Sequence, residues 1–200
     1  MGDSSKIDRL IAFAKDGPFR ARDLGDLGIP RSYLTRLVDR GALERTSRGV
    51  YRLADAQITE LHSLGQVALH APHVVICLLS ALQAHELTTE VPAAVWIMIA
   101  HKAWAPTFDS LQVEVVRASG AALDYGVEEL TIEGVSVKMT QPAKTVADCF
   151  RYRRHVGLDV ALEALRDYLK RSDASIDALV EAARADRVLS VMRPYLEALA

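Results

Sequence analysis

Six arginines stand between residues 31 and 53, in the stretch "RSYLTRLVDRGALERTSRGVYRL", which holds only two acidic residues. The whole chain carries a formal net charge of −2, so this positive charge is a local feature. Guanidinium groups bind phosphates and can donate two hydrogen bonds to a guanine edge. The pattern therefore favours a local basic face for nucleic acid, and it argues against a protein that coats nucleic acid with its entire surface.

The first half of this stretch has the pattern of a short amphipathic helix. Leu34, Leu37 and Val38 are spaced i, i+3, i+4 and are expected to face the core. Pro30 suits the first helical position, and Gly41 suits the residue just past the helix end. A helix of this width fits the DNA major groove, where short polar side chains and arginines reach base edges. The residues expected to read DNA from this helix and its first turn are Arg31, Ser32, Thr35, Arg36 and Arg40.

The second half is predicted to be a β-hairpin. "ALER" and "VYRL" have strand-like composition, and "TSRG" between them supplies turn residues, with a glycine that tolerates positive φ. Arg45, Arg48 and Arg52 on this hairpin are placed to neutralise backbone phosphates. Such contacts give affinity that depends on salt and carries no sequence information.

Two earlier helices are expected to support the recognition helix. The first starts with Ser5 as its N-cap and stops at Gly17-Pro18; the second is short and lies in "ARDLGDLGI", ending at Gly28. Helix, helix-turn-helix and a basic hairpin together predict a winged helix-turn-helix domain over residues 1–55. The alternatives are a solvated charged helix beside an exposed hairpin, and a winged helix that binds a protein. The residues expected to face inward are Ile7, Leu10, Ile11, Ala14, Leu24 and Leu27.

Residues 56–200 are predicted to form a mixed α+β domain whose C-terminal end is helical. The expected elements are a helix over Gln57–Ala71, a buried segment "HVVICLL" leading into the helix "SALQAHEL", strands in "AVWIMIA" and "LQVEVVR", a hairpin around Glu133-Gly134, a helix opened by Pro142, and three further helices. The fold class is therefore α+β, with an N-terminal winged helix-turn-helix.

Several other residue groups could suggest chemistry, but each lacks a partner set. His70 and His73 lack the additional Cys or His residues that a zinc site needs. Glu114 and Lys138 do not have the carboxylate and lysine spacing of a metal-dependent nuclease. Neither a Gly-rich phosphate loop nor a nucleophile elbow around Ser80 is present. We therefore expect no enzyme activity, no cofactor and no metal.

Two further positions are expected to be structural. His85 lies on a largely apolar predicted helix, which favours a hydrogen-bonded structural histidine over a catalytic one. In "PAKTVADCF", Thr145 and Asp148 have the character of residues near a helix start, while Lys144 could bind an anion or a partner's acid. We favour a structural role for this group as well.

The remaining sequence features indicate a cytoplasmic protein. The first residues read as an amphipathic helix and not as a signal peptide. The longest apolar runs are shorter than the roughly 20 residues that span a bilayer, so no membrane association is expected. Cys77 and Cys149 sit in apolar surroundings and are expected to be buried free thiols.

Three stretches together resemble the AbiEi-type antitoxins, which are regulators of type IV toxin–antitoxin systems. They are "RSYLTRLVDRGALERTSRGVYRL", "CLLSALQAHELTTEVP" and "MTQPAKTVADCFRYRRHVGLDVALEAL", and the resemblance runs from the first predicted helix to about residue 170. It implies a winged helix that binds operator DNA and represses its own operon. It also implies a C-terminal domain that neutralises a nucleotidyltransferase-like toxin, without saying which residues do so or whether they touch the toxin.

Two other functions remain open from the residues alone. The chain could be a winged-helix regulator whose second domain senses a small molecule, without a toxin partner. It could also be a nuclease directed by the winged helix. A polar pocket in the second domain would favour the first of these, and a carboxylate cluster there would favour the second.

Overall fold

The computed structural model describes residues 3–56, 59–108 and 111–199, and it forms two compact units. Within the described residues, the first unit takes the chain up to residue 69 together with 131–136. The second unit takes residues 70–130 and the chain from 137 onward. The sequence predicts two domains, residues 1–55 and residues 56–200. The two compact units of the structure do not test that division, so it stays a prediction.

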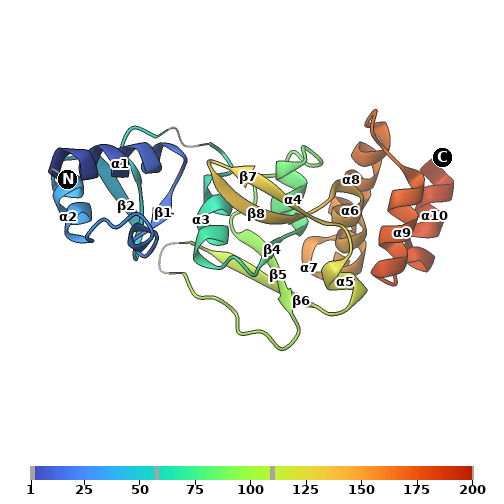
Figure 1. The fold of residues 1–200 in the computed structure, drawn as a ribbon. Helices are drawn as coiled ribbons and strands as arrows, with labels where there is room; N and C mark the ends of the chain where they lie inside the picture. Colours follow the sequence, from blue (N-terminus) through green and yellow to red (C-terminus); the bar gives the residue numbers. More distant parts are fainter. Residues whose placement is uncertain (1–2, 57–58, 109–110, 200) are drawn as a thin grey trace. The chain divides into compact units, whose positions relative to one another are not determined.

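The first unit packs three helical segments against a three-stranded sheet (Figure 1). Its core is built from apolar side chains that include Leu10, Phe19, Leu24 and Leu34, each of them at most 3% exposed. The sheet has the order β1-β3-β2 with antiparallel pairing. The elements are α1 (Asp3–Lys15), β1 (Phe19–Arg20), the 3₁₀ turn η1 (Asp23–Gly25), α2 (Ser32–Asp39), β2 (Leu43–Ser47), β3 (Val50–Leu53) and most of α3 (His62–His70).

The element boundaries in this unit differ from the sequence predictions at four places. Helix α1 already includes Ser5, so Ser5 is not its N-cap. The second helix is only the 3₁₀ turn η1, although Leu24 is buried as expected. Pro30 lies before α2, whose first residue is Ser32. Strand β1 was not predicted, because two residues are too few to show an alternating pattern.

The helix predicted over Gln57–Ala71 is shorter than expected. Helix α3 starts at His62, and Gln57 and Ile58 lie outside the described residues. The amide and hydroxyl of Thr59 donate to Glu133 Oε1 at 2.7 and 2.9 Å, and His62 Nδ1 donates to Glu133 Oε2 at 2.6 Å. Burial acts to raise the pKa of Glu133, but these hydrogen bonds outweigh it and lower the pKa below its usual value. The chain just before α3 is therefore bonded to a carboxylate and does not extend the helix.

Glu133 belongs to the turn between β7 (Val127–Ile132) and β8 (Val135–Thr140), as the sequence predicted. Glu133 and Gly134 have φ of +50° and +79°, which is the backbone of a tight two-residue hairpin turn. The turn lies against the end of α1, where a Cβ on Gly134 would collide with the carbonyl group of Asp16. A side chain at position 134 would thus be blocked by the space as well as by the backbone angle.

The second unit contains a five-stranded mixed sheet of order β6-β5-β4-β8-β7. Strand β4 runs antiparallel to β5 and parallel to β8, while β5 and β6 are parallel and pair from Val95↔Val113 to Ala100↔Ala118. The strands β5 and β6 confirm the predictions for "AVWIMIA" and "LQVEVVR". The elements that complete this unit are β4 (Val75–Ile76), α4 (Leu78–Ala84), β5 (Val95–Ala100), β6 (Val113–Ala118), α5 (Ala121–Asp124), α6 (Pro142–Arg151), α7 (Arg153–Val156), α8 (Leu158–Lys170), α9 (Ile176–Ala185) and α10 (Leu189–Leu199).

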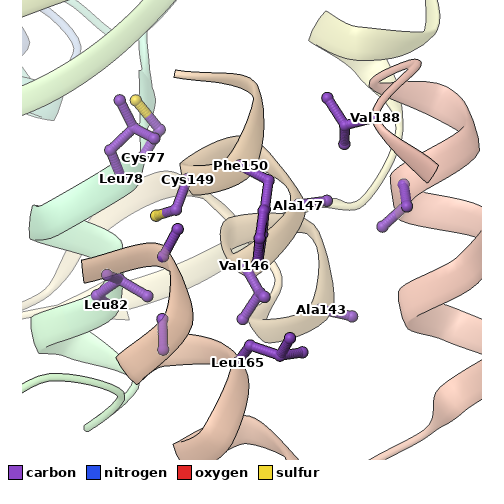
Figure 2. Close-up of a cluster of buried hydrophobic side chains, with 14 of the residues drawn as sticks. Cys77, Leu78, Leu82, Ala143, Val146, Ala147, Cys149, Phe150, Leu165 and Val188 are labelled. Carbon is purple, nitrogen blue, oxygen red and sulfur yellow. The ribbon is translucent and has the colours of Figure 1, made fainter. Parts of the chain in front are cut away.

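Helix α6 is the centre of the helical C-terminal end. Pro142 occupies its first turn, as predicted, and its residues from Ala143 to Phe150 are all buried. Figure 2 shows Val146, Cys149 and Phe150 of α6 among apolar side chains that include Leu82 of α4 and Leu165 of α8. Cys77 and Cys149 are free, buried thiols, which confirms that prediction. The structure is thus α+β with a helical C-terminal end, in agreement with the predicted fold class.

Candidate nucleic-acid interface

Helix α2 presents one polar face, as its sequence pattern requires. Leu34 and Leu37 are buried and Val38 is half-buried, so the apolar spacing is confirmed. The helix ends where Gly41, at φ +69°, donates its amide hydrogen to the carbonyl of Val38, and Ala42 donates to Leu37. The five predicted DNA-reading residues of this segment are all exposed: Arg31, Ser32, Thr35, Arg36 and Arg40. Helix α2 and the two residues that flank it therefore carry three exposed arginines, one exposed serine and one exposed threonine.

The hairpin that follows carries the next two cationic side chains. Strands β2 and β3 are joined by Arg48 and Gly49, and Gly49 has φ +77°. Arg48 is exposed at this turn. Arg45 is also exposed, and its Nε donates to the carbonyl of Ser47 at 3.2 Å, next to a shift in strand register. The side chains expected to meet phosphates are thus accessible at both positions.

Arg52, the third predicted arginine of the hairpin, has different surroundings. It is only 7% exposed, and its Nη2 donates to Glu44 Oε2 at 2.8 Å. Its Nε and Nη1 atoms are buried and have no hydrogen-bond partner among the described residues. In β3, burial alternates along the strand, so Arg52 shares the buried side with Val50. The letters "VYRL" do not reveal this burial, because Val50, Tyr51 and Leu53 are all apolar and the only polar residue would be expected to face water. This placement does not present Arg52 to a phosphate.

The second unit holds the buried charged group that the sequence placed near a helix start. Lys144 is 1% exposed and its Nζ contacts Asp148 of the same helix and Asp186 Oδ1, the latter at 3.0 Å. Burial acts to lower the pKa of Lys144, but the two carboxylates outweigh it and raise the pKa. Burial also raises the pKa of Asp148 well above its usual value, against the effect of Lys144. Lys144 is therefore engaged with acids of its own chain, which agrees with a structural role.

His85 and His70 both have ordinary structural surroundings. His85 Nε2 donates to the carbonyl of Thr140 at 2.7 Å, and burial lowers its pKa, as expected for a structural histidine. The ring of His70 packs against Phe108 at 4.9 Å between ring centres. Within residues 3–56, 59–108 and 111–199, no group of three or more His, Cys, Asp or Glu side chains is placed to hold a metal ion. In the same residues, no helix combines the length and the apolar character that crossing a bilayer requires.

Comparison with known proteins bears on both units. The solved structure of the RV2827C protein from Mycobacterium tuberculosis is similar with a TM-score of 0.56, over 96% of this chain and 81% of that protein. The two sequences are 14% identical, so the similarity concerns the fold alone. A search of curated proteins finds no match.

A family model matches the segment that contains α1, η1, α2 and the β2–β3 hairpin. It is the family described as "Transcriptional regulator, AbiEi antitoxin", and the match covers residues 5–54. This agrees with the resemblance stated from the sequence over its N-terminal part; the resemblance of the later stretches stays a prediction. Residues 5–54 thus match the AbiEi antitoxin and transcriptional-regulator family.

Proposed function

We propose that this protein is the antitoxin of a type IV toxin–antitoxin system, which binds operator DNA to repress its own operon and neutralises a nucleotidyltransferase-like toxin. The observation that carries the proposal is the exposed polar face of α2 inside a segment that matches an antitoxin and regulator family. The proposed work is divided between the N-terminal winged helix, for DNA, and residues 56–200, for the toxin. We place the protein in the cytoplasm, where both partners would be found.

The DNA-binding half of the proposal assigns different roles to the helix and the hairpin. Arg36, in the middle of α2, is proposed to donate two hydrogen bonds to a base edge in the major groove. Ser32 and Thr35 would accompany it from the same helix, and Arg31 and Arg40 from the positions that flank the helix. Arg45 and Arg48 would bind phosphates and supply affinity that falls with salt. Arg52 is left out of this interface, because it is buried and bonded to Glu44.

The antitoxin half of the proposal rests on the family of residues 5–54 and on the resemblance of the later sequence. We propose that residues 56–200 act without enzyme activity and without a cofactor. Two features of this part are compatible with a binding role: an exposed tryptophan, Trp104, and an open groove beside the end of β5.

A ligand-sensing winged-helix regulator without a toxin partner is the second candidate, and one observation favours it. The groove in the second unit has a volume of about 460 Å³ and includes the polar side chains of His73, Asp124 and Lys138. Cavities of about 300–1,000 Å³ commonly hold small molecules. This candidate predicts that a small molecule changes operator affinity, whereas the antitoxin proposal predicts that operator affinity does not depend on one.

Co-expression with the product of the neighbouring gene separates the two candidates. Cells that express this neighbour alone should stop growing if it is a toxin, and co-expression of the full chain from an unrelated promoter should restore growth. A neighbour that arrests growth and is not neutralised would contradict the antitoxin proposal. A neighbour without any effect on growth, together with operator binding that responds to a metabolite, would favour the ligand-sensing regulator.

A further inference from the structure

Trp104 is the most exposed large apolar side chain in the described residues. It lies in the connection between β5 and β6, and 93% of its surface is exposed. Tryptophan offers a large apolar area with few rotatable bonds, and it is among the residues that most often dominate the energy of protein interfaces. An indole left in water in this way offers a large apolar area to a partner.

The backbone that carries Trp104 is held in place by Arg117 of β6. The Nη1 of Arg117 donates to the carbonyl oxygens of Ala100, His101 and Ala103, at 3.3, 2.9 and 2.7 Å. The amide of His101 also donates to the carbonyl of Ala118, at 2.9 Å. The turn before Trp104 is therefore fixed on three sides, and little backbone freedom is lost when the indole meets a partner.

An open groove of about 460 Å³ lies directly beside this tryptophan, since Ala103 is one of its lining residues. Apolar side chains of Val75, Leu123 and Val127 form part of its wall. Its volume falls in the range of about 300–1,000 Å³ that is usual for pockets holding small molecules, so it has room for an indole. The indole of the same chain does not occupy it, because that indole is almost fully exposed.

A protruding side chain and a groove on the same patch are what a two-fold symmetric contact needs, because each copy must offer both halves. The charges fit the same exchange. Lys102 is exposed beside Trp104, and the groove lining holds two exposed acids, Asp124 and Glu129, against one exposed lysine, Lys138. A two-fold axis between the tryptophan and the groove would bring Lys102 of one copy toward Asp124 of the second copy.

We propose that two copies of this chain associate by placing Trp104 of each copy in the groove of the other. Each indole would bury about 150–250 Å². Two indoles and the matching groove walls then bury about 600–1,000 Å² in total, which is below the roughly 1,200 Å² of stable specific complexes. The contact is therefore weak in solution, with a dissociation constant in the micromolar range. Two adjacent operator half-sites would strengthen it by holding both copies on one DNA molecule.

Sedimentation velocity of the full chain, at protein concentrations from about 1 to about 300 µM, tests the association directly. The wild type should change from monomer to dimer over this range. Trp104→Ala should weaken the association about thirtyfold or more, as for a central interface tryptophan. Val91→Ala is the matched control, because Val91 is also an exposed apolar side chain, at 80%, and lies outside the groove. This control should associate like the wild type.

Two further variants test the mode of contact. Ala100→Phe fills the groove from an exposed position while it keeps Trp104, and it should weaken association as strongly as Trp104→Ala does. In a Trp96→Phe background, Trp104 is the single tryptophan, and its emission should shift to shorter wavelengths as the protein concentration rises. Melting curves establish that each variant is folded.

Three results would overturn the proposal. The first is a wild-type chain that stays monomeric throughout the concentration range. The second is a dimer that persists in both Trp104→Ala and Ala100→Phe. The third is a Trp104 emission that does not respond to protein concentration but shifts when the purified toxin is added, which would assign the indole to a different protein.

Discussion

The arginines of α2 and the β2–β3 hairpin carry the same charge as Lys144 of α6, but in opposite surroundings. Arg36, Arg45 and Arg48 are exposed, whereas Lys144 is 1% exposed and contacts two aspartates. An exposed cation is accessible to a phosphate or a base edge. A buried cation must keep its partners, because an unpaired charge in the interior is costly. The comparison predicts that the exposed cations act in binding and the buried one in stability.

Arg52 lies between these two cases and shows what decides them. It stands three residues from the exposed turn, yet it is buried and bonded to Glu44. Position in a basic stretch of sequence therefore does not by itself define a binding residue. The side of the strand on which a cation lies decides whether it can reach DNA.

The largest effect is expected from Lys144→Met. It leaves Asp148 and Asp186 in the interior without their cation, and breaking a buried ion pair in this way costs about 3–5 kcal/mol of unfolding free energy. Lys170→Met is the matched control: the side chain of Lys170 is 74% exposed, and its ion pair with Asp167 should be worth about 0–1 kcal/mol. Urea denaturation of both variants measures the difference. Similar unfolding free energies for the two variants would contradict the structural role of Lys144.

The pH dependence of stability sharpens the same contrast. Burial raises the pKa of Asp148, so the folded state holds a proton that the unfolded state releases above its usual pKa of 3.8. The stability linked to this proton is complete below that value and is lost as the pH rises through the pKa of the folded state. Asp148→Asn removes this loss, so the variant should gain stability relative to the wild type as the pH rises, with a slope of at most about 1.4 kcal/mol per pH unit. Urea denaturation between pH 4 and pH 8 measures the unfolding free energies of the variant and the wild type. A difference between them that stays constant over this range would refute the prediction.

Arg36→Ala should reduce operator affinity about tenfold or more, because one bidentate contact to a base provides roughly 1–3 kcal/mol of discrimination. Affinity for scrambled DNA should change less. The unfolding free energy should stay within about 0.5 kcal/mol, since Arg36 is exposed. Gel-shift titrations with both DNAs measure this, with Arg184→Ala as a control that removes an exposed arginine from α9. Equal losses on both DNAs would show that Arg36 does not read bases.

A smaller effect is expected from Arg48→Ala at the hairpin turn. It should weaken binding to all DNA sequences about equally and reduce the slope of log affinity against log salt by roughly one phosphate contact. Binding measured at several salt concentrations, on operator and scrambled DNA, gives this slope. An altered sequence preference with an unchanged slope would instead make Arg48 a base-reading residue.

Local sequence patterns predicted the structure well where neighbouring residues alone determine it. The turn at Glu133-Gly134 was predictable because alternating runs flank it and its glycine accepts positive φ, and the inward face of α2 followed from Leu34, Leu37 and Val38. Long-range partners were not predictable in the same way. Lys144 and Asp148 are four residues apart and visibly share a helix face, but Asp186 lies 42 residues from Lys144 and only the packing of α9 against α6 brings it close. The fold class and the exposed helix face were thus accessible from sequence, and the buried charge group was not.

The central claim is that DNA binding and toxin neutralisation belong to different parts of the chain. The most direct test measures promoter repression and growth rescue in the same cells, with Arg36→Ala expressed beside the toxin from an unrelated promoter. We predict that repression falls about tenfold, following operator affinity, while rescue from the toxin remains at the wild-type level. A folded Arg36→Ala variant that loses rescue together with repression would contradict this division.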